Sequence, residues 1–138
     1  MKSDREYEYI RKSIATFVEG LRTLDYPTIS KIFHKDALSF GVRNGTISFV
    51  RRDHWQTMRE QELAEGAYDP ENQAWFQILS IERYGNAASV IIELAFSTDP
   101  VDYIDLYHML KTEQGWKIVN KIFHHIAKKK RGFNSTSS

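Results

Sequence analysis

Apolar residues recur at every third or fourth position through the first part of the chain. Between Asp4 and about Leu24 this spacing predicts an amphipathic helix whose apolar face is formed by Tyr7, Ile10, Ile14, Phe17, Val18 and Leu21. A second, shorter helix is expected through Ile29 and Ile32, with Pro27 near its start, where a missing N–H costs least. A third helix is expected from His54 to about Leu63.

The remaining segments have the pattern of strands. Two short runs, 37–42 and 46–50, flank Asn44-Gly45, which is a strong signal for a two-residue hairpin. From Ala74 to Ile126, runs rich in β-branched and aromatic residues are separated by turn signals at Gly85-Asn86, Asp99-Pro100 and Gln114-Gly115. This order predicts an α+β fold in which helices cover one face of an antiparallel sheet.

Two-residue loops at the three turns would fix how the four long strands pair. The interior face would then be mostly apolar, formed by Trp75, Gln77, Leu79, Ile81, Val90, Ile92, Leu94, Phe96, Tyr103, Asp105, Tyr107, Met109, Trp116, Ile118, Asn120, Ile122 and His124. In this register Asp105 and His124 are cross-strand neighbours. One β-bulge would turn either side chain to the opposite face.

Composition narrows the classes of partner. The 138 residues carry a formal net charge of +1, so we expect neither a nucleic-acid nor a membrane partner. The chain has no cysteine, which excludes disulfides, thiolate metal sites and a cysteine nucleophile.

The N-terminal residues lack the apolar core of a signal peptide, so a cytoplasmic location is the default expectation. We expect one domain at 1–127, followed by a basic, flexible, solvated tail at 128–138.

Three stretches resemble the SnoaL-like and putative lumazine-binding branch of the nuclear transport factor 2-like superfamily. Residues 32–37 are similar to its "FHPDA" segment, with Lys35 at the usual proline, and residues 81–88 resemble its "I-x-x-x-G-x-x-A" turn. Asp105, Lys111 and residues 116–121 resemble its "D-Y-x-x-L-L-K … G-x-W-K-I-V-N-K" ending. The similarity spans about Arg11 to Phe123.

Two departures from the family pattern concern the pocket. Leu106 stands where the family has a tyrosine after the aspartate, and Gly115 directly precedes Trp116. Tyr103 or Tyr107 is therefore expected to supply the aromatic wall.

The resemblance implies a cone-shaped, cystatin-like fold, in which a strongly curved antiparallel sheet holds three N-terminal helices over its concave face. It also implies a conical cavity and often a dimer formed through the outer face of the sheet. The outer face expected from the register is too apolar for open solvent, with Phe76, Ile78, Ile91, Ile104, Leu106, Val119 and Phe123. A homodimer through this face is therefore expected.

The candidate chemistry centres on Asp105 and His124. In one interpretation Asp105 is a general acid or base whose proton His124 shares or tunes, as in a SnoaL-like or ketosteroid-isomerase-like enzyme. In others, the two form a satisfied polar pair, or contact a ligand without chemistry. The fold itself hosts enzymes, ligand carriers and noncatalytic protein interaction modules, so whether the protein is an enzyme stays open.

The expected partner is a small, largely apolar or cyclic molecule. Besides Asp105 and His124, the residues expected to contact it are His34, Trp55, Trp75, Gln77, Phe96, Tyr103, Tyr107, Asn120 and Ile122. No cofactor motif is visible. No metal is expected either, because adjacent His124 and His125 point to opposite faces of a regular strand.

Overall fold

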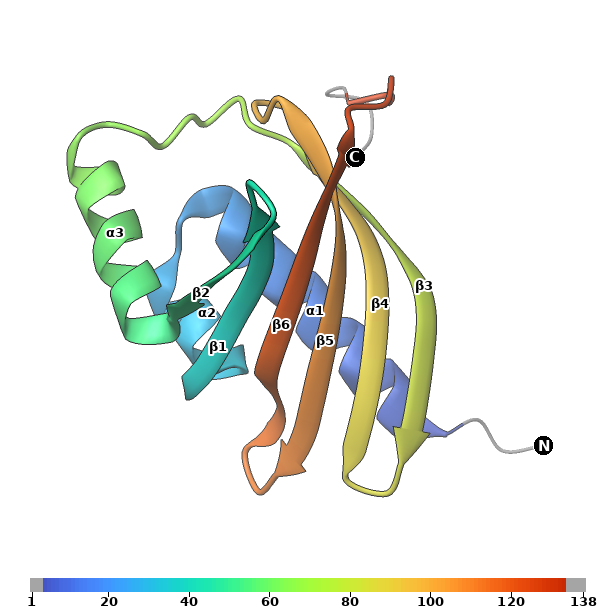
Figure 1. Cartoon of the computed structure of the whole chain (residues 1–138). Helices are drawn as coiled ribbons and strands as arrows, with labels where there is room; N and C mark the ends of the chain where they lie inside the picture. Colours follow the sequence, from blue (N-terminus) through green and yellow to red (C-terminus); the bar gives the residue numbers. More distant parts are fainter. Residues whose placement is uncertain (1–3, 134–138) are drawn as a thin grey trace.

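The structure, a computed structural model, describes residues 4–133. Its helices are α1 (Arg5–Thr23), α2 (Tyr26–Ile32) and α3 (Arg52–Ala64). Its strands are β1 (Phe33–Arg43), β2 (Thr46–Arg51), β3 (Ala74–Tyr84), β4 (Ala87–Phe96), β5 (Val101–Thr112) and β6 (Gly115–Ala127). They form one curved sheet in the order β2-β1-β6-β5-β4-β3, in which only β1 and β6 run parallel (Figure 1).

The predicted α+β fold is confirmed. Helix α1 runs behind the sheet, while α3 lies beside β1 and β2 at one end of it (Figure 1). Strand β1 begins at Phe33, earlier than the sequence pattern indicates, because Phe33 already pairs with Ile118 of β6. The pairing then breaks until Leu38, which pairs with Asn120.

Helix α1 is held at both ends by local contacts. The Asp4 carboxylate accepts a hydrogen bond from the Glu6 N–H at 2.9 Å, which satisfies one of the unpaired donors of the first turn. Leu24 ends the helix in the left-handed conformation with φ 56°. Gly20 lets α2 approach closely, since a Cβ there would stand 2.9 Å from Cγ1 of Ile29.

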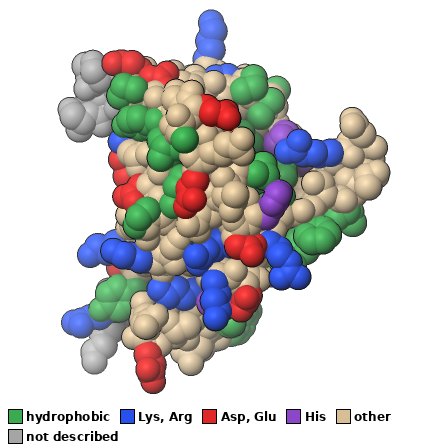
Figure 2. Space-filling model, turned by 90° about the vertical axis from the view of Figure 1, so that its left-hand side faces the viewer, with side chains coloured by type: hydrophobic (Ala, Val, Ile, Leu, Met, Phe, Trp, Pro, Cys, Tyr) green, Lys and Arg blue, Asp and Glu red, His purple; other side chains and the backbone are tan. Residues whose placement is uncertain are grey.

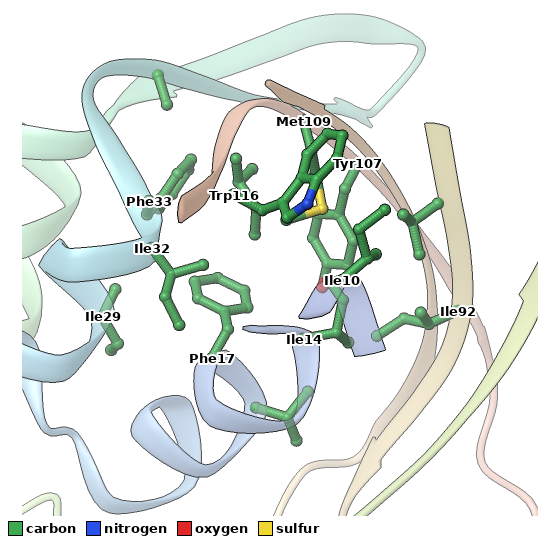
Figure 3. Packing of buried hydrophobic residues seen from close by; sticks show 14 of the residues in the cluster. Ile10, Ile14, Phe17, Ile29, Ile32, Phe33, Ile92, Tyr107, Met109 and Trp116 are labelled. Atoms are coloured by element: carbon green, nitrogen blue, oxygen red, sulfur yellow. The ribbon is translucent and has the colours of Figure 1, made fainter. Parts of the chain in front are cut away.

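The apolar face of α1 packs against the concave side of the sheet. Phe17 is fully buried, and its ring meets those of Phe33 and Tyr107 edge to face, each with centroids 5.8 Å apart. Figure 3 shows Phe17 beside Ile32 and Phe33, with Trp116 and Met109 grouped next to Tyr107. This core fills the space between α1, α2 and the sheet.

The predicted interior face is confirmed for β4 and β5. Val90, Ile92 and Leu94 are buried, as are Asp105, Tyr107 and Met109. The predicted pairing of Tyr84 with Ala87 is also confirmed, but the four-residue β4–β5 loop pairs Leu94 with Tyr103 instead of Asp105. This shift of two residues keeps each side chain on its predicted face.

Strand β3 departs from the prediction because it contains a bulge. The register shifts between Ile78 and Ser80, which leaves Leu79 half exposed. Before the bulge, Phe76 and Ile78 pack against the core, so Trp75 and Gln77 point to the outer face. The predicted interior positions of Trp75, Gln77 and Leu79 are therefore wrong, as are the predicted outer positions of Phe76 and Ile78.

A second bulge changes strand β6. The β5–β6 turn is Glu113-Gln114, one residue earlier than the predicted Gln114-Gly115. Farther along β6, Val119 is an extra residue between Ile118, which pairs with Met109, and Asn120, which pairs with His108. Trp116 and Ile118 are buried as predicted, but beyond the bulge the faces exchange. Asp105 pairs with Phe123, and His124 pairs with Ile104 on the outer face.

Residues 128–133 lie against the outer face of the sheet. The Arg131 side chain is only 9% exposed and bonds to Asp102 and Glu93, which differs from the solvated tail that composition predicts. The remainder of that predicted tail, 134–138, lies outside the described residues. The domain boundary at 127/128 stays a prediction.

Candidate ligand-binding site

A cavity of about 410 Å³ opens between the concave side of the sheet and the helices. Its aromatic and apolar walls come from distant parts of the chain: Leu21, Leu24, Tyr26, Ile29, Val50, Trp55, Met58, Leu94, Phe96, Tyr103 and Phe123. Charged side chains, including Arg22, Arg43, Arg59 and Glu62, also contribute to the lining. A volume of this size accommodates a small organic molecule.

Asp105 is the polar group buried deepest in this lining, at 1% exposure. Its Oδ2 accepts a hydrogen bond from the Tyr107 hydroxyl at 2.7 Å and lies 3.8 Å from Nζ of Lys121. Its Oδ1 is buried and has no hydrogen-bond partner within residues 4–133. Such an atom carries an uncompensated desolvation cost of about 1–3 kcal/mol, which a donor placed in the cavity would offset.

Three tyrosines in or next to the cavity lining have raised pKa values. Burial raises the pKa of Tyr107 well above its usual value, and the charge of Asp105 raises it further. Burial also raises the pKa of Tyr103, whose hydroxyl donates to Asp99 at 2.7 Å. Burial raises the pKa of Tyr26 to about 12, and its buried hydroxyl has no hydrogen-bond partner within the described part of the chain.

Of the candidate residues, four line the cavity: Trp55, Phe96, Tyr103 and Asp105. Tyr107 lies behind Asp105 in the core, where it orients the carboxylate. The bulges turn Trp75, Gln77, Asn120, Ile122 and His124 away from the cavity, so the structure does not place them in its lining. His34 is also outside the lining, and its Nδ1 accepts a hydrogen bond from the Asp36 N–H at 3.1 Å.

The expected Asp105–His124 neighbours are thus on opposite faces of the sheet. The same exchange brings Lys121, Phe123 and His125 into the cavity lining, although a regular register assigns them to the outer face. The His125 ring stacks on Phe123 with centroids 5.5 Å apart and meets Tyr103 edge to face at 5.2 Å. No signal in the sequence marks the bulge at Val119, so regular alternation could not identify these three residues.

Phe123 has its place in the cavity because the neighbouring strand lacks a side chain at one position. A Cβ atom at Gly41 of β1 would overlap the Phe123 ring. Gly41 therefore allows the tip of the Phe123 ring to approach the backbone of β1 while Phe123 forms part of the cavity wall.

Two further classes of site are absent from the described residues. Within 4–133, no three His, Asp or Glu side chains come close enough together to hold a metal ion. None of the helices in this range is long and apolar enough to cross a membrane. On the face in Figure 2, basic and acidic side chains are interspersed, so this face offers no continuous basic surface to a phosphate backbone.

The fold has solved counterparts. An NTF-2-like protein of unknown function from Silicibacter pomeroyi DSS-3 is 23% identical over 91% of this chain and all of its own, with a TM-score of 0.77. An NTF2-like protein of unknown function from Shewanella baltica OS155 is also 23% identical, over 93% and 99% of the two chains, with a TM-score of 0.73. A cystatin-like domain of unknown function from Nostoc punctiforme PCC 73102 is 12% identical over 92% and 81%, with a TM-score of 0.70.

The conical α+β architecture and its cavity thus define a protein of the NTF2-like, or cystatin-like, class. Residues 5–124 match the model of the family described as "Putative lumazine-binding", and the chain belongs to that family. The match confirms the resemblance seen in the sequence. No curated protein matches the chain.

Proposed function

We propose that the protein binds a small, flat, largely apolar ring compound in the cavity beside Asp105. The observation that carries this proposal is that Asp105 lines a 410 Å³ cavity while its buried Oδ1 atom lacks a partner among residues 4–133. A buried acceptor of this kind is stabilised by a ligand that donates an N–H or O–H. Membership of a family named for lumazine binding supports a ligand-binding role.

The neighbouring groups narrow the chemistry of the ligand. The Lys121 ammonium is a donor 3.8 Å from the Asp105 carboxylate, so a ligand carbonyl beside its own donor group would complement both. Trp55, Tyr103 and Phe123 offer aromatic surface for a ring. The preferred ligand therefore carries adjacent donor and carbonyl groups on one edge of a flat ring.

Lumazine, a fluorescent pteridinedione, has this arrangement and is a suitable first probe. Titration of the protein with lumazine should change the fluorescence of the probe in a saturable way. Asp105→Asn should weaken binding by about tenfold or more, because the amide presents an N–H where an acceptor is needed. Trp55→Ala should also weaken binding, whereas Tyr84→Ala, at the exposed β3–β4 turn, should not.

The ring-binding proposal fails if neither lumazine nor a panel of flat lactams, imides and enols changes the melting temperature or fluorescence of the protein. It fails equally if binding occurs but is the same in wild type, Asp105→Asn and Trp55→Ala. A protein interaction module with a filled cone would give the first result. The size of the cavity weighs against that alternative.

An enzyme of the ketosteroid-isomerase type is the second candidate, in which Asp105 would move a proton next to a ligand carbonyl. The nearby Lys121 favours this candidate, since its ammonium would stabilise the negative charge that develops on the ligand carbonyl oxygen. The pairing with His124 no longer contributes to it. The test is exchange of α-hydrogens of a cyclic ketone for deuterium, which should be lost in Asp105→Asn and kept in Tyr84→Ala.

A homodimer through the outer face belongs to the same proposal. Strand pairing places Phe49, Phe40, Ile122, Leu106 and Ile91 in one apolar row across five strands. Phe49 is 58% exposed and Ile122 43%, which is unusual for large apolar side chains on a sheet. Sedimentation equilibrium should give twice the chain mass for the wild type and the chain mass for Ile122→Lys, whereas a monomeric wild type would refute the dimer.

A further inference from the structure

A separate polar site lies on the outer face of the sheet, away from the cavity. Trp75 of β3 pairs with Ala95 of β4, and Asp102 of β5 stands next to Tyr103, whose partner is Leu94. Trp75, Ala95 and Asp102 thus lie in a row across three strands, with Glu93 two residues along β4. The small Ala95 leaves room above it between the indole and the carboxylate.

The two carboxylates of this site need a cation. With Arg131 in place, Asp102 is fully buried and the side chain of Glu93 is 13% exposed, so both carboxylates face the guanidinium and not water. A buried carboxylate without a partner is strongly destabilising. The strands therefore build a site that favours a positively charged group.

Arg131 fills the site from the far end of the chain. Its guanidinium donates to Asp102 Oδ2 from Nη2 at 3.0 Å and bonds to Glu93 through the same nitrogen. Its Cζ lies 3.8 Å from the centre of the Trp75 ring, which is the geometry of a cation–π stack. A planar fork that bridges two carboxylates while stacking on an indole selects arginine over lysine.

The rest of the C-terminal segment is held less firmly. The Lys129 N–H donates to Asp102 at 2.9 Å, but the side chains of Lys128 and Lys129 are 33% and 57% exposed. Arg131 is thus the main buried anchor. One further contact of the segment is the hydrogen bond from Nζ of Lys128 to the Phe96 carbonyl oxygen at 2.8 Å, and this lysine is also partly exposed.

We propose that Trp75, Glu93 and Asp102 form an arginine-binding site on the outer face, which Arg131 occupies as a releasable latch that keeps an arginine side chain of a partner polypeptide out. The strands position all three groups without help from the latch. Release of Arg131 would uncover Glu93, Asp102 and the indole of Trp75, and another guanidinium would restore both the ion pairs and the stack. The site thus alternates between its own arginine and one supplied by a partner.

Cleavage by a lysine-specific protease tests the latch in the full chain. The wild type should be cut slowly after Lys128, Lys129 and Lys130, because an arginine-anchored segment seldom opens. Arg131→Gln should be cut about tenfold faster at these bonds, since cleavage follows the population of the open form. Arg131→Lys should also be cut faster, since an ammonium neither stacks nor bridges as the guanidinium does. Equal rates for all three proteins would overturn the proposal.

Binding of a labelled peptide, acetyl-Lys-Lys-Arg-Gly-Phe-amide, tests the site itself. It should bind Arg131→Gln at least about tenfold tighter than wild type, where the site is occupied. Binding should be lost in Arg131→Gln/Glu93→Gln, and the same peptide with lysine for arginine should bind weakly. Equal binding of the two peptides, or no binding to Arg131→Gln, would overturn the proposal. If circular dichroism shows that Arg131→Gln is unfolded, Arg131→Lys replaces it in the same comparisons.

Discussion

Nζ of Lys121 lies 3.8 Å from Oδ2 of Asp105, with the lysine side chain 16% exposed and the carboxylate 2%. The ammonium also lies 6.0 Å from the centre of the Phe17 ring. The two charges come from neighbouring strands, and the bulge at Val119 is what turns Lys121 toward Asp105. The pair gives the cavity a donor and an acceptor side by side.

Removal of the lysine charge should destabilise the protein. Lys121→Met leaves the Asp105 carboxylate with the Tyr107 hydroxyl alone, and we expect a loss of about 1–3 kcal/mol in the free energy of unfolding. Urea denaturation measures this loss, with Lys12→Met on the exposed side of α1 as the control. The double variant Asp105→Asn/Lys121→Met should cost less than the sum of the single changes, and strict additivity would show that the pair does not interact.

The hydroxyl of Tyr107 should influence stability in a manner that depends on pH. Tyr107→Phe removes a donor from the buried carboxylate, at a cost of about 1–3 kcal/mol near neutral pH. Because the folded-state pKa of Tyr107 is raised above 10.0, the contribution of its hydroxyl is fully present below pH 10. It declines as pH rises further, since the unfolded state can ionise while the folded state cannot.

The stability difference between wild type and Tyr107→Phe should therefore shrink as pH rises from about 10 to about 11.5. Urea denaturation at several pH values measures it. Tyr84→Phe, at a tyrosine 79% exposed, is the control and should show no such trend. A constant difference for Tyr107→Phe would contradict the inferred direction of the pKa shift.

A methyl group at Gly41 should lower the stability of the protein because it would overlap the Phe123 ring. Gly41→Ala places a Cβ where the Phe123 ring lies, and overpacking of this kind costs about 1–3 kcal/mol. Phe123→Leu removes the ring, so the added cost of Gly41→Ala should nearly vanish in the Phe123→Leu background. Thermal unfolding of the two single variants and the double variant tests this. If Gly41→Ala costs as much in the Phe123→Leu background as in the wild type, the Phe123 ring is not the cause of the destabilisation.

Acid should weaken the contact of Arg131 with the sheet. Hydrogen bonds from Arg131 and Lys129 lower the pKa of Glu93 below 4.5. Burial alone would raise the pKa of Asp102, but the Lys129 N–H and Arg131 outweigh it, so that this pKa lies below 3.8. The stability from these contacts is therefore present above those unfolded-state values and is lost as pH falls through the lower folded-state values.

The difference in unfolding free energy between wild type and Arg131→Gln should consequently be constant from about pH 5 to 8 and decline toward about pH 2. Lys130→Gln, an exposed neighbour, is the matched control and should differ little from wild type throughout. A difference that grows in acid would contradict the lowered pKa values of Glu93 and Asp102.

The order of helices and strands, the fold class and the family could all be recognised in the sequence, because they rest on local patterns. Helical spacing marks α1, turn residues mark the hairpins, and alternation along β4 and β5 places Asp105 in the interior. These features depend on residues close together in the chain. One interior aspartate was thus identified without any tertiary information.

The partners of that aspartate were decided by the tertiary structure alone. Alternation has a period of two, so the bulges at Leu79 and Val119 exchange the faces of every residue beyond them. As a result, Lys121 lies beside Asp105 where the regular register predicted His124. Trp75, which the regular register placed in the cavity, stacks instead on the guanidinium of Arg131. Bulges form where a strand must bend around the helices, and this fit depends on contacts between segments far apart in the sequence.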